Sequence, residues 1–168
     1  MPNDQPRRPY LKLTPSQADY VKALYQLGAG GEAISTSRLA ARLGISSPSA
    51  TEMLRKLAGL GLVSHDRHGG ALLTETGEIA GVELVRRQRL LELFLTERLH
   101  YTPDEAHRDA ERLEHVISER LEQRIFESLG RPTVDCRGDR NPTSGGGIED
   151  RRDPDLPNVG AGSPHATV

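Results

Sequence analysis

The sequence contains a single cysteine, Cys136, among 168 residues, so it offers neither a disulfide framework nor a cluster of thiolate ligands. The segment from Met1 to Arg8 lacks the apolar core of a signal peptide, and no apolar run approaches the length of a membrane span. We therefore expect a soluble protein of the cytoplasm that does not enter a membrane. The length suffices for one domain with a substantial core or for two small ones.

Charge of either sign is plentiful, and the net charge of −2 is unevenly distributed. Residues 1–90 contain 12 Lys and Arg against 8 Asp and Glu, a balance of +4. Residues 91–168 contain 10 against 16, a balance of −6. A basic first half followed by an acidic second half that carries histidines suits a nucleic-acid surface followed by a cation-binding or oligomerising region.

Capping signals divide the first part of the chain into three short helices. Thr14-Pro15-Ser16-Gln17 is a capping-box start, and glycines follow each apolar-periodic segment. The helices are expected from Thr14 to Gly28, from Ser35 to Gly44 and from Ser47 to Gly61. Two short helices joined by a tight turn, here the second and third, make a helix-turn-helix unit.

The segments 62–65 and 71–74 have the composition of paired strands around a basic, glycine-bearing tip, which indicates a wing. A helix-turn-helix followed by a wing predicts DNA binding, although a winged domain without DNA contact is the structural alternative. Four residues of the recognition helix are predicted to face base edges: Ser47, Ser49, Thr51 and Glu52. Three basic residues are predicted to face phosphates: Arg55, Lys56 and the wing residue Arg67. Pro48, at the start of the recognition helix, completes the predicted DNA-binding set.

The second half is expected to be all helical, with a long helix from Thr74 to His100 and a shorter one from Ser118 to Gly130. These helices carry more apolar surface than a winged domain can cover, which predicts a homodimer. From Arg131 onward, 38 residues include 6 Gly and 5 Pro and no aromatic residue, so this tail is expected to be disordered. The expected domains are therefore residues 1–75, 76–130 and 131–168, in a mostly α fold.

The stretch after Thr102 concentrates potential metal ligands. Thr102, Pro103 and Glu105 predict a helix start. Drawn as one continuous helix, this stretch has four potential ligands within an arc of about 100°. They are His107, Glu111, Glu114 and His115. On the same wheel an apolar stripe adjoins the arc; it consists of Ala110, Leu113, Ile117 and Leu121.

Partly burying imidazoles and carboxylates beside a core costs free energy unless a cation pairs with them. A divalent metal would be such a cation. A solvated helix face or a structural salt network is the alternative, since the segment also carries several arginines. A metal-dependent hydrolase that uses Glu114 as base is a third possibility. The sequence offers this hydrolase no phosphate-binding glycine loop and no second nucleophile, so we expect no enzyme.

With these features the chain resembles the diphtheria toxin repressor family of metal-dependent regulators, in the branch of the manganese-transport regulators. The resemblance spans about residues 14–130. It is carried by residues 16–22 (SQADYVK), the Ser47-Pro48-Ser49 helix start, residues 86–92 (RRQRLLE) and, most specifically, residues 111–115 (ERLEH).

The resemblance implies a primary metal site made by Asp19, Glu111, Glu114 and His115. Gln88, Glu92 and His107 fall at the positions of the family's ancillary site. Two positions depart from the family pattern: Gln88 stands where a histidine ligand is usual, and Lys22 stands where manganese regulators often have a glutamate. An oxygen-rich shell with one imidazole and no sulfur suits Mn(II) best, with Fe(II) as the alternative.

The family resemblance further implies a homodimer that binds a palindromic operator in double-stranded DNA when it is loaded with metal, and that represses genes of metal uptake or balance. One cation that joins Asp19 to the second domain would fix the angle between the domains, and so the spacing of the two recognition helices. The alternative within the same fold is a metal-independent winged-helix regulator that senses a small molecule.

Overall fold

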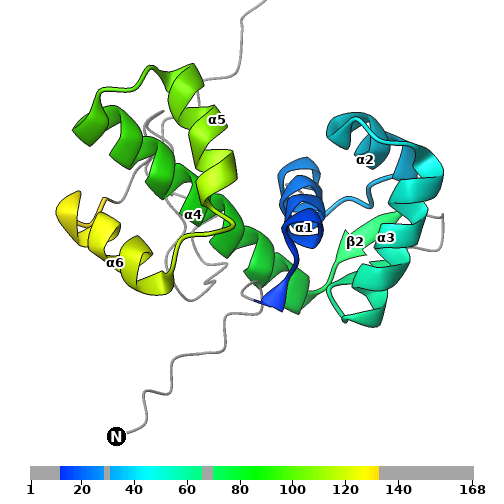
Figure 1. The fold of residues 1–168 in the computed structure, drawn as a ribbon. Coiled ribbons are helices and arrows are strands. Elements are labelled where there is room, and N and C mark those ends of the chain that lie inside the picture. The colour runs from blue at the N-terminus through cyan, green and yellow to red at the C-terminus, as the bar shows by residue number, and fades with distance from the viewer. Residues whose placement is uncertain (1–11, 29–30, 66–69, 133–168) are drawn as a thin grey trace, which may run out of the picture.

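The computed structural model describes residues 12–28, 31–65 and 70–132. These residues form six helices and one two-stranded sheet, in two lobes that share the long helix α4 (Figure 1). The first lobe is a winged helix-turn-helix and the second is all helical, which confirms the expected fold class. None of the helices in these ranges is both long enough and apolar enough to cross a membrane.

The first lobe consists of α1 (Pro15–Leu27), α2 (Thr36–Leu43), α3 (Ser47–Gly59), β1 (Val63–His65) and β2 (Ala71–Leu73). The expected caps are present: the Thr14 hydroxyl accepts a hydrogen bond from the Gln17 backbone N–H, and the Gln17 side chain accepts one from the Thr14 N–H. Gly44 ends α2 in the left-handed conformation, at φ +67°, and so turns the chain into α3.

The wing is a short antiparallel hairpin in which Val63 pairs with Leu73 and His65 with Ala71. Ile34 adds one bridge to Ala71, so the segment before α2 is attached to the sheet. The wing tip, with Arg67, lies outside the described residues.

One apolar cluster fills the first lobe, with Val21, Leu39, Ala50 and Leu57 fully buried and the start of α4 packed on it. At Gly81 of α4 (Glu75–Leu99), a Cβ atom would lie 2.7 Å from the Tyr25 Cβ. Such a distance is too short for two carbons, so glycine is needed where α4 crosses α1. The close crossing seats the first lobe directly on the long helix.

The second lobe consists of the rest of α4, α5 (Pro103–Leu113) and α6 (Glu119–Ser128). Its separate apolar cluster contains Leu91, Leu95, Ala110 and Ile125. The predicted helix starts after Thr74, Thr102 and Ser118 are confirmed, since each of these side chains caps the helix that follows it.

The helix that carries the candidate ligands is shorter than the helical wheel assumed, and the wheel is wrong beyond Glu114. α5 ends at Leu113, with Glu114 as its C-cap in helical conformation, so His115 lies in the connection to α6. At this turn the guanidinium of Arg87 on α4 donates to the carbonyl of Glu114 at 2.9 Å and to that of Ile117 at 3.0 Å. A buried arginine that takes up these carbonyls favours a turn where a helix would otherwise continue.

The predicted apolar stripe is correspondingly divided. Ala110 and Leu113 belong to α5, Ile117 lies in the connection, and Leu121 is on α6, where 47% of it is exposed. The tail from residue 133 onward lies outside the described residues. The expected domain limits at 75 and 130 stay predictions; the two apolar clusters are separated within α4, between Leu84 and Leu90.

Candidate metal centre and nucleic-acid interface

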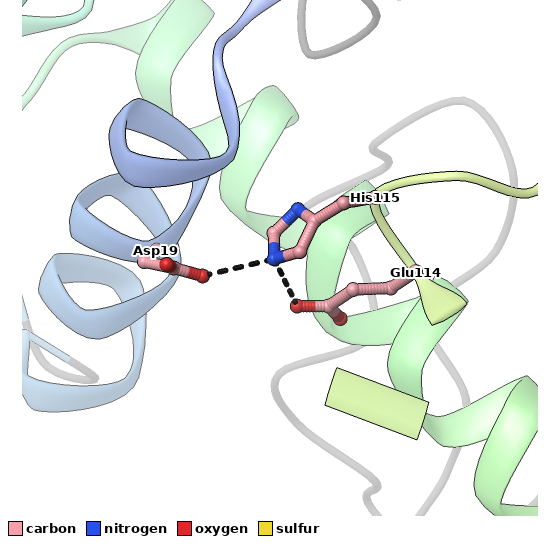
Figure 2. A group of neighbouring side chains, drawn as sticks. All are labelled: Asp19, Glu114 and His115. Carbon is pink, nitrogen blue, oxygen red and sulfur yellow. Dashed lines mark ion pairs between the residues drawn. The ribbon is translucent and has the colours of Figure 1, made fainter. Parts of the chain in front are cut away.

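The candidate metal centre lies where α1 of the first lobe faces the end of α5. Asp19 and Lys22 are three residues apart on α1 and therefore share one face of that helix. Glu114 and His115 approach the same face from the C-terminal end of α5 (Figure 2). Residues that are almost a hundred positions apart thus meet between the lobes.

Asp19, Glu114 and His115 offer ligand atoms that all lie within 4.8 Å of one another, and among the described residues they are the one such group. His115 Nε2 is 3.2 Å from Asp19 Oδ1 and 3.6 Å from Glu114 Oε1 (Figure 2). Adjacent ligands of a single octahedral ion, each about 2.1 Å from it, lie about 3 Å apart. The separations of 3.2 and 3.6 Å are close to this spacing, so the three residues are a candidate site for one divalent ion.

Glu114 is the buried member of this group, with 2% of its surface exposed. Its Oε1 accepts a hydrogen bond from the Lys22 ammonium at 2.5 Å, whereas its Oε2 has no hydrogen-bond partner among the described residues. Burial raises the pKa of the Glu114 carboxyl, and the charge of Lys22 opposes this effect. A buried carboxylate oxygen without a partner is costly, and a bound cation would compensate it.

The residues at the predicted ancillary positions lie together beside this group. His107 Nδ1 is 2.7 Å from Glu92 Oε1, and the Gln88 amide nitrogen is 3.0 Å from the same oxygen and 3.2 Å from His107 Nδ1. Glu111 contacts this set rather than the first group: its Oε1 is 3.6 Å from His107 Nε2, and half of the side chain is exposed. The predicted assignment of Glu111 to the primary site stays a prediction.

A cavity of about 310 Å³ connects the two sets of ligands. Its lining combines α1 and α2 of the first lobe with α4, α5 and the connection after α5. The lining residues used below are Asp19, Lys22, Gln88, His107, Glu111 and His115. This cavity gives the candidate ligands room for an ion and its remaining water ligands.

Two residues that the sequence did not mark as functional hold the site together. Arg87 positions Glu114 through the backbone carbonyl of that residue, and its Nε donates to Glu122 Oε2 at 3.1 Å. Lys22, noted in the sequence only as a missing ligand, pairs directly with Glu114. A charged residue on the buried face of α4 would have been the sequence signal for Arg87. That face could not be recognised from the sequence, because four other charged residues lie close to Arg87 on α4 (Glu83, Arg86, Arg89 and Glu92).

The predicted recognition helix α3 presents the predicted DNA contacts to solvent. Ala50, Leu54 and Leu57 face the core, and the exposed residues are Ser47, Pro48, Ser49, Thr51, Glu52, Arg55 and Lys56. Lys56 pairs with Glu52 at 2.8 Å, and its hydrogen bond holds the pKa of the Glu52 carboxyl below its usual value. An ionised Glu52 suits an amino group on a base edge and repels a phosphate.

Two family models match the chain and together span most of it. The N-terminal DNA binding domain of the iron dependent repressor matches residues 12–71. The iron dependent repressor metal binding and dimerisation domain matches residues 74–143. The boundary between the two matches falls at the start of α4.

Individual relatives agree with these matches. The iron-dependent repressor IdeR of Mycobacterium tuberculosis is 32% identical over 160 residues, which cover 89% of this chain and 68% of IdeR. The transcriptional regulator MntR of Escherichia coli is 42% identical over 81 residues, which cover 48% of this chain and 52% of MntR. A manganese-dependent transcriptional repressor, solved in complex with manganese, is 43% identical with a TM-score of 0.70, over 76% of this chain and 59% of that chain. The chain thus spans between about half and two thirds of the length of these relatives.

Proposed function

The chain belongs to the iron-dependent repressor family, and we propose that it is a metal-activated repressor of transcription that controls the uptake or balance of Mn(II) or Fe(II). In this proposal it acts as a homodimer on double-stranded, palindromic operator DNA in the cytoplasm. Its function is binding and release of DNA, so it needs no catalytic step.

One observation carries the proposal: the ligand group combines one residue of the DNA-binding lobe with two residues of the second lobe. Asp19 belongs to α1, on which the helix-turn-helix is packed, while Glu114 and His115 follow α5. A divalent ion would add a bond between α1 and the end of α5, which among the described residues are joined by two ion pairs. Asp19 would transmit this constraint to α3 through the shared apolar core of the first lobe.

The donor set supports Mn(II) first and Fe(II) second. Two carboxylates and one imidazole, without sulfur, form a group that favours these ions over softer ones. The solved relative in complex with manganese and the iron-dependent IdeR show that the family includes regulators of both metals.

For the second position we propose a weak or empty metal site. The Gln88 amide nitrogen donates to Glu92 and contacts His107, so a protein donor already satisfies groups that would otherwise bind an ion. A neutral amide also brings no charge and is a weaker donor than imidazole. We therefore expect one tightly held ion per subunit, in the group of Asp19, Glu114 and His115.

The test is DNA binding as a function of metal. A duplex can be selected from random-sequence DNA with the protein in Mn(II), and its affinity then measured with Mn(II), Fe(II), Zn(II) or a chelator. We expect Mn(II) or Fe(II) to tighten binding by a factor of about 5 to 150, the range of typical allosteric coupling. Equal affinity in Mn(II) and in chelator would favour the metal-independent regulator instead.

A further inference from the structure

Lys22 places a fixed positive charge inside the candidate metal centre. Only 8% of this residue is exposed, and its ammonium donates to Glu114 Oε1 at 2.5 Å. The same oxygen faces His115 Nε2, 3.6 Å away. From the DNA-binding lobe, a lysine therefore holds the carboxylate that the proposed function assigns to the metal.

Apolar packing does not explain how the end of α5 is held against α1. Among the described residues, the apolar cluster of the first lobe contains nothing after Leu84, and that of the second lobe contains nothing before Leu90. Residues of α1 and of the segment after α5 face each other across the cavity of about 310 Å³. Apart from the shared helix α4, this contact therefore depends on polar interactions.

Two ion pairs make this contact in the part of the chain that the structure describes. Asp19 Oδ1 meets His115 Nε2 at 3.2 Å, and Lys22 meets Glu114. A bound ion would take over the first pair, because Asp19 and His115 both belong to the ligand group. The second pair needs no metal, and because it is buried, removal of one partner would leave the other charge unpaired, which is strongly unfavourable.

We propose that the Lys22–Glu114 ion pair is a metal-independent link between the lobes, which keeps part of the protein in the DNA-binding arrangement when no metal is bound. This inference rests on the proposed function. The ion pair and the metal favour the same arrangement of the two lobes. Each therefore reduces the gain in DNA affinity that the other can produce. Lys22 thus positions Glu114 and sets the basal level of DNA binding.

The test compares Lys22→Met with the wild type in chelator and in saturating Mn(II), on the duplex selected above. Methionine keeps an unbranched side chain without the charge. In chelator we expect Lys22→Met to bind DNA at least about fivefold more weakly than the wild type. In saturating Mn(II) we expect its affinity to return to within about twofold of the wild type, because the metal then joins the lobes by itself.

Two further variants make the comparison specific. Lys22→Arg keeps the charge and should retain most of the wild-type affinity in chelator. Lys12→Met makes the same chemical change at an exposed lysine before α1 and should leave both affinities unchanged. Lys22→Gln, which keeps a donor without charge, should fall between methionine and wild type and serves as the comparison if Lys22→Met does not fold.

Equal affinity of the wild type, Lys22→Met and Lys22→Gln in chelator would overturn the inference. A loss that saturating Mn(II) does not restore would also overturn it, because Lys22 would then serve only to build the site. Failure of the proposed function gives a different result: Mn(II) would not tighten DNA binding of the wild type, whatever the variants do in chelator.

Discussion

At position 114, the two oxygens of one buried carboxylate lie in different environments. Oε1 is bound by Lys22, and Oε2 is buried without a partner among the described residues. The position therefore demands a carboxylate for charge and not only for shape.

Glu114→Gln should lower the affinity for Mn(II) by more than about tenfold, because even groups that merely orient a ligand contribute 10–100-fold to metal affinity. Titration calorimetry measures this affinity, and circular dichroism checks that the helices remain. Glu97→Gln, at an exposed position on α4, is the matched control and should bind Mn(II) as the wild type does. An unchanged Mn(II) affinity in Glu114→Gln would remove this residue from the site.

Gln88 lies at the proposed second metal position, next to Glu92 and His107. Gln88→His should place an imidazole one turn before Glu92 on α4, on the same face, where the amide now lies between Glu92 and His107. We expect calorimetry to show one tightly bound Mn(II) per subunit in the wild type and a second in the variant. Two tight ions in the wild type, or no gain in the variant, would contradict the one-ion proposal.

At the scale of the elements, α5 depends on its N-terminal cap. The Thr102 hydroxyl and backbone N–H both contact the Glu105 carboxylate, and these hydrogen bonds, the side-chain bond above all, hold its pKa below the usual value of 4.5. An acid with a lowered pKa in the folded state contributes stability above the unfolded-state pKa, and this contribution is lost as the pH falls through the folded-state value.

Wild type should therefore be more stable than Glu105→Gln at pH 6, and the difference in their free energies of unfolding should shrink as the pH falls below 4.5. Denaturant unfolding at several pH values measures it. In a Thr102→Ala background, which should itself cost about 1 kcal/mol through loss of the cap, the pH-dependent difference should be smaller. A difference that is constant from pH 6 to pH 3 would show that the charge of Glu105 does not matter.

Element starts were predictable because their signals are local. Each capping residue lies within three positions of the N–H group that it accepts from, as at Thr14, Thr74 and Ser118. The end of α5 was not predictable in the same way. The carbonyl at this end accepts from Arg87, which lies 27 residues before Glu114 on another helix.

At the scale of the molecule, the site too was predictable only where the signal was local or came from the family resemblance. The residue types and the family resemblance indicated the two sets of ligands, and the structure brings Asp19, Glu114 and His115 together. The ion pair of Lys22 with Glu114 joins residues 92 positions apart, and no local pattern predicts which buried carboxylate a lysine will meet. The sequence therefore showed the lysine as a missing ligand, whereas the structure shows an interaction between the lobes.

In the proposed function, a metal acts on DNA binding by joining the two lobes, and Asp19 would be the ligand that the DNA-binding lobe contributes. The most direct measurement is the affinity of Asp19→Asn for Mn(II) and for the selected duplex, with and without Mn(II). Asp109→Asn, on α5 and away from the ligand group, is the matched control. If the metal acts by joining the lobes, Asp19→Asn should bind Mn(II) more weakly, bind the duplex in chelator no more tightly than the wild type does, and gain little DNA affinity from Mn(II). Full stimulation of Asp19→Asn by Mn(II) would contradict this proposal, because the metal would then act without a bond to the DNA-binding lobe.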